Sequence, residues 1–181
     1  IDLPPLNVPR SSHTVAIVDR STALQTTWIA YALGGFNGSR KCNVVERYVL
    51  GRNCWEVINP MTTARSGFAA VTIDRTVYAL GGRSGYGVVA TCETMHAQTN
   101  QWAPIAPMKL ARAQHSAIVF EGNIIVVGGW TGNEWTNSCE RYDPNIEKWV
   151  QIISLPVAIG HPMFALGDLP KEEAIADDTF G

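Results

Sequence analysis

Four histidines and four cysteines are the side chains in this sequence with the clearest chemical potential. Histidine and cysteine are common zinc ligands, and a histidine can also act as a general base. Their spacing favours neither role, because the sequence contains no Cys-x-x-Cys pair and no cysteine–histidine pattern of a zinc site. We therefore expect no metal site and free thiols. The residues concerned are His13, His96, His115, His161, Cys42, Cys54, Cys92 and Cys139.

A second chemical candidate is the segment 85–90, Gly-Tyr-Gly-Val-Val-Ala, which matches a loose nucleotide-binding pattern. In that pattern a helix follows the glycines, and its N-terminus faces the phosphates. Here the residues that follow favour a β-strand, so the helix terminus is missing. Because no catalytic constellation remains, we predict that the protein is not an enzyme and binds no cofactor.

The chain repeats itself with a period of 47 residues. Three Gly-Gly pairs begin at residues 34, 81 and 128, and each is followed at fixed offsets by a glutamate and then by a tryptophan. Such a period predicts an array of small structural units. The recurring residues, together with two arginines between the units, are Gly34, Gly35, Gly81, Gly82, Gly128, Gly129, Glu46, Glu93, Glu140, Trp55, Trp102, Trp149, Arg65 and Arg112.

Each unit contains four short strand signals, clearest in the third unit at residues 114–120, 124–127, 138–142 and 148–152. Four antiparallel strands in a repeat of this length are typical of a β-propeller blade, so we predict an all-β fold. The tryptophans should be buried in equivalent positions as apolar wedges between blades. The repeated glutamates and arginines should pair together or cap buried backbone groups, which is a structural role.

The combined pattern resembles the kelch repeat: Gly-Gly, Glu-x-Tyr-Asp-Pro, Trp, and Pro-Met-x-x-x-Arg at the hinge between units. The resemblance covers residues 4 to about 167. The Pro-Met hinge is similar to that of the kelch-like family, whose members carry BTB and BACK domains before a six-bladed propeller. Two departures are Met95, where the repeat has a tyrosine, and the last hinge at residues 155–159, which lacks the arginine.

The repeats, together with the closing strand that the kelch-like resemblance implies, divide the chain into five parts. Blades are expected at residues 4–59, 60–106 and 107–153, a closing innermost strand at 154–168, and a flexible acidic tail at 169–181. Because three blades and one strand cannot close a ring, the chain resembles the C-terminal half of a longer six-bladed protein. A three-repeat protein that dimerises into a six-bladed ring is the alternative.

Composition narrows the function classes further. A net charge of −2 gives no basic field for nucleic acid or an anionic membrane, and the apolar runs are too short to span a bilayer. The start of the chain, Ile-Asp-Leu-Pro-Pro, does not resemble a signal peptide. We therefore expect a cytoplasmic protein.

The resemblance implies that function lies on loops at one end of the propeller. Two loop families line that end, one after each Gly-Gly pair and one at each hinge. Arg83 among tryptophans suits an acidic or mixed peptide. The residues expected to bind a partner are Phe36, Asn37, Arg40, Arg83, Ser84, Tyr86, Trp130, Asn133 and Trp135 in the first family, and Ser12, Gln114 and His161 in the second.

By resemblance, the function expected is that of a protein-interaction module, the substrate receptor of a cullin-RING ubiquitin ligase. A cullin would bind through domains outside this chain. The alternative is a cytoskeletal kelch protein that binds or cross-links actin. The sequence upstream would discriminate between the two, since BTB and BACK domains accompany the ligase role and tandem propellers the cross-linker.

Overall fold

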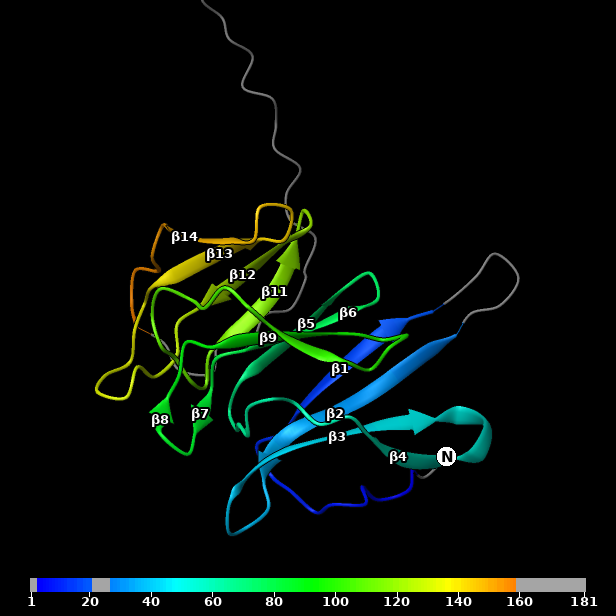
Figure 1. The fold of residues 1–181 in the computed structure, drawn as a ribbon. Helices are drawn as coiled ribbons and strands as arrows, with labels where there is room; N and C mark the ends of the chain where they lie inside the picture. Colours follow the sequence, from blue (N-terminus) through cyan, green and yellow to red (C-terminus); the bar gives the residue numbers. More distant parts are fainter. Residues whose placement is uncertain (1–2, 21–26, 159–181) are drawn as a thin grey trace, which may run out of the picture.

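The computed structural model describes residues 3–20 and 27–158. These residues form three four-stranded antiparallel sheets, a two-stranded hairpin and one short 3₁₀ helix, η1 (Leu50–Arg52). Figure 1 shows the three sheets following one another along the chain. The predicted all-β fold of four-stranded antiparallel blades is confirmed.

Each sheet is one blade, and its strands run in chain order from the inner edge outward. The first blade consists of β1 (Thr14–Asp19), β2 (Trp28–Phe36), β3 (Lys41–Val49) and β4 (Cys54–Ile58). The second consists of β5 (Ala69–Ile73), β6 (Thr76–Leu80), β9 (Cys92–His96) and β10 (Trp102–Ile105). The third consists of β11 (Ser116–Phe120), β12 (Asn123–Val127), β13 (Cys139–Asp143) and β14 (Lys148–Ile152). The hairpin of β7 (Arg83–Ser84) and β8 (Gly87–Val88) extends from the second blade.

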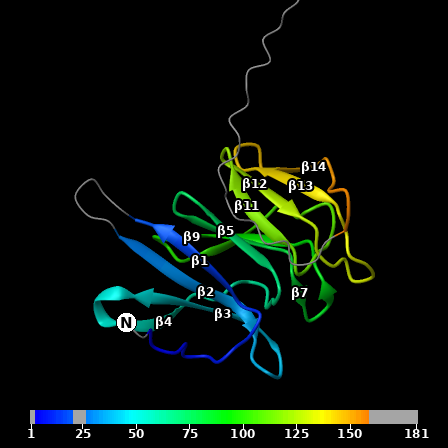
Figure 2. The same ribbon diagram turned by 180° about the vertical axis from the view of Figure 1, so that it is seen from behind.

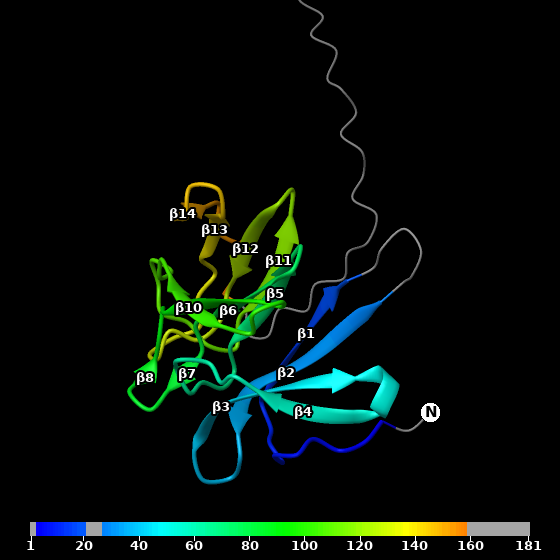
Figure 3. The ribbon, with the colours of Figure 1, turned by 45° about the vertical axis from the view of Figure 1, so that its right-hand side comes forward.

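The innermost strands of the three blades gather about a common axis. Strands β1 and β11 both lie beside β5, as Figures 2 and 3 show from two sides. Just before these strands begin, neighbouring backbones are hydrogen-bonded to each other. The N–H of Gly67 donates to Ser12 O over 3.1 Å, and the N–H of Gln114 donates to Gly67 O over 2.7 Å. All three residues have positive φ, between 51° and 57°. Residues with left-handed backbone conformation at equivalent positions of the repeat therefore link each blade to the next.

Two hydrophobic cores fill the spaces between the blades. The first lies between blades one and two, where Tyr31 and Leu33 pack with Val77 and Met95. The second lies between blades two and three, where Leu80 packs with residues of the third blade such as Ile124, Val126, Tyr142 and Trp149. Alternate residues of β6 face the two cores, Val77 and Ala79 the first and Tyr78 and Leu80 the second, as strand geometry requires. The second blade therefore contributes one face to each core.

The repeated tryptophans occupy equivalent positions but differ in burial. Each donates its indole N–H to the carbonyl of the residue just before a hinge proline. The three pairs are Trp55 with Pro4 at 3.1 Å, Trp102 with Asn59 at 3.2 Å, and Trp149 with Ala106 at 2.9 Å. Only Trp149 is buried, whereas Trp55 and Trp102 are partly exposed. The prediction of equal burial was wrong, because Trp55 lies on the face of the first blade that is turned away from the first core.

Buried ion pairs join each hinge to its blade. Three arginines and three glutamates form the pairs Arg10–Glu46 at 2.8 Å, Arg65–Glu93 at 2.9 Å and Arg112–Glu140 at 2.8 Å. All six side chains are at most 1% exposed. Each arginine also donates to main-chain carbonyls of its blade, and each glutamate accepts main-chain N–H groups of the hinge. The repeated charges are therefore structural.

Some expected features lie outside the described residues. These are His161, the greater part of the closing strand expected at 154–168, and the acidic tail expected at 169–181. The start of the last hinge is described: the N–H of Leu155 donates to Asn137 O over 2.9 Å. Within residues 3–20 and 27–158, no helix is long and apolar enough to cross a membrane.

Candidate functional site

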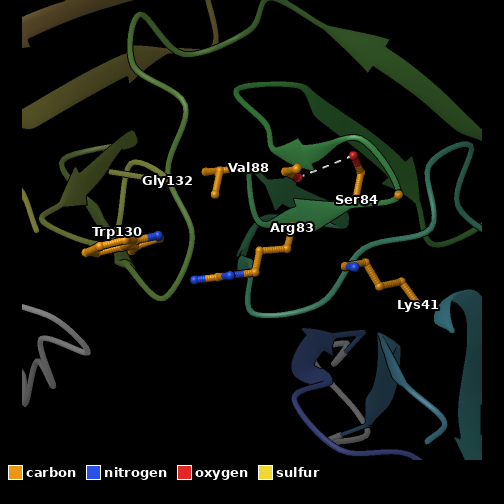
Figure 4. A pocket seen from close by; sticks show the side chains of 8 residues that line it. Lys41, Arg83, Ser84, Val88, Trp130 and Gly132 are labelled. Carbon is orange, nitrogen blue, oxygen red and sulfur yellow. Dashed lines mark hydrogen bonds between the residues drawn. The ribbon is translucent and has the colours of Figure 1, made fainter. Parts of the chain in front are cut away.

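Loops from all three blades meet around one cavity at the end of the molecule that follows the Gly-Gly pairs. The cavity has a volume of about 360 Å³, and the first blade contributes Lys41, the second Arg83 and Val88, and the third Trp130 and Gly132. Figure 4 shows the Arg83 side chain between Lys41 and Trp130, extended toward the indole. Two cations and one aromatic ring therefore face a shared space.

The hairpin that carries Arg83 has a fixed backbone. The N–H groups of Ser66 and Arg83 donate to each other's carbonyls over 3.1 and 2.9 Å, and Arg83 pairs with Val88 across the hairpin. The hydroxyl of Ser84 accepts the N–H of Tyr86 over 3.1 Å and lies 3.4 Å from Gly87 O. Arg83 itself is exposed. The chain thus holds this guanidinium on a rigid support with its charge facing solvent.

Ser84 and Tyr86 take different places in the hairpin. Ser84 is only 4% exposed, so its hydroxyl stabilises the turn rather than facing a partner. Tyr86 projects from the tip and is fully exposed. Of these two predicted residues, only Tyr86 therefore offers its side chain to another molecule.

The third-blade loop carries two tryptophans whose rings are in contact. The rings of Trp130 and Trp135 meet edge to face with centroids 5.4 Å apart. The hydroxyl of Thr131 accepts the N–H of Glu134 over 3.2 Å and closes the turn between them. Trp135 remains 42% exposed, and the predicted Asn133 is exposed at the turn. The two indoles thus support each other and still present apolar surface.

The first-blade loop is organised by Asn37. Its side-chain oxygen accepts the N–H groups of Ser39 and Arg40 over 3.1 and 3.0 Å, so the predicted Asn37 shapes the turn. Phe36, which precedes it, is 37% exposed. Beside this loop lies a second cavity of about 530 Å³, lined among others by Asn37, Arg40 and Lys41. Lys41 therefore borders both cavities.

Ser12 and Gln114 do not reach the cavity at Arg83. They line a separate space of about 210 Å³ near the inner strands, together with His13, Phe68 and His115. Both residues were expected at the same end as the loops after the Gly-Gly pairs. The preceding residues, Ser11 and Ala113, pair with Phe36 and Trp130 of those loops, so Ser12 and Gln114 lie at the same end but line a different cavity, where neighbouring blades are linked.

His115 is buried in the wall of that third cavity. Desolvation lowers its pKa to about 3, and the charge of Arg112 acts in the same direction. The imidazole is therefore neutral at physiological pH, and its position is that of Phe68 in the preceding blade. Within the described ranges, no group of three or more His, Cys, Asp or Glu side chains is placed to hold a metal ion.

We expect His115→Phe to make the protein less sensitive to acid. The unfolded chain binds a proton at His115 below about pH 6.5. The folded chain does so only near pH 3, so the wild type loses stability as the pH falls between these values. The loss from this one group is about 1.4 kcal/mol per pH unit. Urea unfolding of both proteins between pH 7 and pH 4 measures the difference in slope, with exposed His96→Phe as the control. Equal slopes for wild type and His115→Phe would contradict the burial argument.

Two comparisons with known proteins bear on this arrangement. The model of the KLHDC2/KLHL20/DRC7 Kelch-repeats domain matches residues 4–162. The chain belongs to the kelch-repeat family. A search of curated proteins gave no match. Kelch-repeat domains are typically protein-interaction modules without enzymatic activity, and protein partners are the general expectation for this kelch domain.

Two residues were not predicted from the sequence, the cavity residue Lys41 and the structural residue Arg10. Lys41 was overlooked because it begins a strand, although it follows Arg40 directly in the loop. Arg10 was overlooked as a structural residue because its hinge reads Pro5-Leu6 rather than Pro-Met. The signal for Arg10 was its position before Glu46. The two residues are 36 apart in the sequence, whereas Arg65 and Glu93 are 28 apart, and the first blade is longer than the second.

Proposed function

We propose that this kelch domain recognises an acidic segment of a partner protein across its loop end. The observation that supports the proposal most is the placement of Arg83 beside Lys41 and Trp130 around one cavity. A guanidinium offers five donors in a rigid fork that suits carboxylates. The neighbouring indoles supply apolar area at a low entropic cost, and tryptophan and arginine are enriched among residues that dominate binding energy.

Rigidity supports the same role. The backbone of Arg83 is hydrogen-bonded to Ser66, and that of Trp130 exchanges hydrogen bonds with Ala113 over 2.9 and 2.7 Å. A binding surface that is ordered before the partner arrives loses less entropy on association. The blades thus hold the loops in position, and the loop side chains supply the recognition.

The finer role that we propose is substrate receptor of a cullin-RING ubiquitin ligase in the cytoplasm. It rests on the similarity of the Pro-Met-x-x-x-Arg hinge to the kelch-like family. In that role BTB and BACK domains, outside these residues, would bind the cullin. The four cysteines are free, which agrees with a reducing compartment. Co-precipitation of a cullin with the full-length protein tests the role, whereas co-sedimentation with actin filaments would favour the cytoskeletal alternative.

Arg83→Ala is expected to weaken binding about 30-fold or more, as for a residue at the centre of an interface. The probe is a peptide selected from a random linear library on the immobilised wild-type protein, and its affinity is measured by fluorescence polarisation. The melting temperature should change little, because an exposed side chain contributes little to stability.

The control is Arg75→Ala. Arg75 is also an exposed arginine, but it lies in the turn between β5 and β6, away from the residues that line the cavity. Unchanged affinity for Arg75→Ala and lost affinity for Arg83→Ala support the site. If Arg83→Ala unfolds the domain, or binds the selected peptide as wild type does, the site is assigned wrongly.

A further inference from the structure

We infer that the partner segment carries two acidic residues, one held at Arg83 and one at Arg40, with an apolar or aromatic residue beside the first on Trp130. This inference rests on the proposed function and specifies its ligand. It follows from two neighbouring cavities that share one lysine.

The two cavities form a basic track across the first and second blades. One is lined by Arg83 and Lys41, and the other by Lys41 and Arg40. Every charged residue that lines either cavity is basic. A single carboxylate would leave one end of this track without a counter-charge, whereas two carboxylates would place one anion on each side of Lys41.

Hydrogen bonds fix the backbone that carries Arg40, Lys41 and Arg83, so the spacing between the two cavities is defined. Lys41 pairs with Phe36 across β2 and β3, and Asn37 holds the turn between them. Lys41 is partly buried, so less side-chain freedom remains to be lost when an anion binds. A fixed spacing between the cavities predicts a fixed spacing between the two acidic residues of the ligand.

The third blade gives the track a direction. Its loop carries the indoles of Trp130 and Trp135, and the one charged residue in the loop segment 130–136 is the acidic Glu134. A ligand carboxylate would be repelled there, while an apolar or basic residue would be accepted. The acidic half of the ligand should therefore lie over the first two blades, and its apolar half over the third.

Library selection on four proteins tests the inference: wild type, Arg40→Gln, Lys41→Gln and Arg83→Gln. Peptides enriched on wild type should carry two acidic residues at one preferred spacing and a neighbouring apolar residue. On Arg40→Gln, the enriched peptides should keep only one of the acids. For a two-acid peptide from the wild-type pool, Arg40→Gln should lower affinity about threefold to fivefold, as expected for an exposed pair. Lys41→Gln should lower it about tenfold, because Lys41 serves both anions.

A double-mutant cycle isolates the second contact. Replacing the Arg40-side acid of the peptide by glutamine should lower affinity more on wild type than on Arg40→Gln, where only its contact with Lys41 remains to be lost. Arg75→Gln is the control for loss of a positive charge elsewhere. Circular dichroism melting confirms that each variant is folded.

The outcomes separate the two claims. Enrichment of peptides with a single acidic residue, or unchanged affinity of the two-acid peptide for Arg40→Gln, overturns the two-anion motif and leaves the proposed function standing. No enrichment on wild type, or full binding by Arg83→Gln, overturns both.

Discussion

Arg112→Ala is expected to lower the free energy of unfolding by about 3–5 kcal/mol, as for the loss of one partner of a buried ion pair. Arg112 is fully buried and lies 2.8 Å from Glu140. It also donates to Gly128 O and Ser138 O, each over 2.8 Å, so its removal leaves the buried carboxylate without a counter-charge and takes this donor from both carbonyls. Urea unfolding followed by tryptophan fluorescence measures the loss.

Two further variants show whether the effect is specific. Arg47→Ala removes an arginine from a partly exposed pair with Glu56, and should cost no more than about 1 kcal/mol. Replacing Arg112 and Glu140 together by leucine should remain destabilising by about 2 kcal/mol, because the carbonyls of the blade and the N–H groups of Lys109 and Leu110 lose their partners. Recovery of wild-type stability in that double variant would show that the charges do not support the backbone.

The fold was predictable from the sequence because its main constraints recur. A Gly-Gly pair, a glutamate and a tryptophan at one period identify equivalent places in three blades, whatever the residues between them. The same periodicity could not predict how deeply each repeated tryptophan is buried, because burial depends on the neighbouring blade as well as on the residue. Trp149 is buried in the second core, and Trp55, with the same local contacts, is partly exposed.

The candidate site was predictable in outline and not in detail. Phe36, Arg83 and Trp135 are exposed in the segments that follow the Gly-Gly pairs, where the resemblance implied binding residues. Asn37 and Ser84, in contrast, use their side chains within their own turns, because short loops must satisfy their own backbone N–H groups. Residue type alone does not reveal whether a polar side chain in a loop points inward or outward.

Gly81→Ala is expected to destabilise the protein by about 2–5 kcal/mol, the sum of a left-handed backbone cost and an overpacking cost. Gly81 has a φ of +61°, and a Cβ atom there would lie 2.6 Å from Arg112 O and 2.7 Å from the Cε of Met108. The carbonyl cannot move away freely, because Arg112 O accepts the N–H of Gly82 over 2.8 Å. An added methyl group would therefore push the hinge away from the second blade, and urea unfolding would record the loss.

Gly38→Ala separates the two costs. Gly38 also has a positive φ, of +94°, but a Cβ atom there would have no neighbour within 4 Å, so only the backbone cost of about 1–2 kcal/mol remains. A larger loss at Gly81 shows that close approach between hinge and blade requires glycine at this place. Equal losses would mean that the hinge yields to a methyl group, and the Gly-Gly pairs would then recur for their backbone conformation alone. The first outcome is expected, since a Cβ atom at Gly34, the equivalent residue of the first blade, would likewise lie 2.6 Å from a hinge carbonyl, that of Arg65.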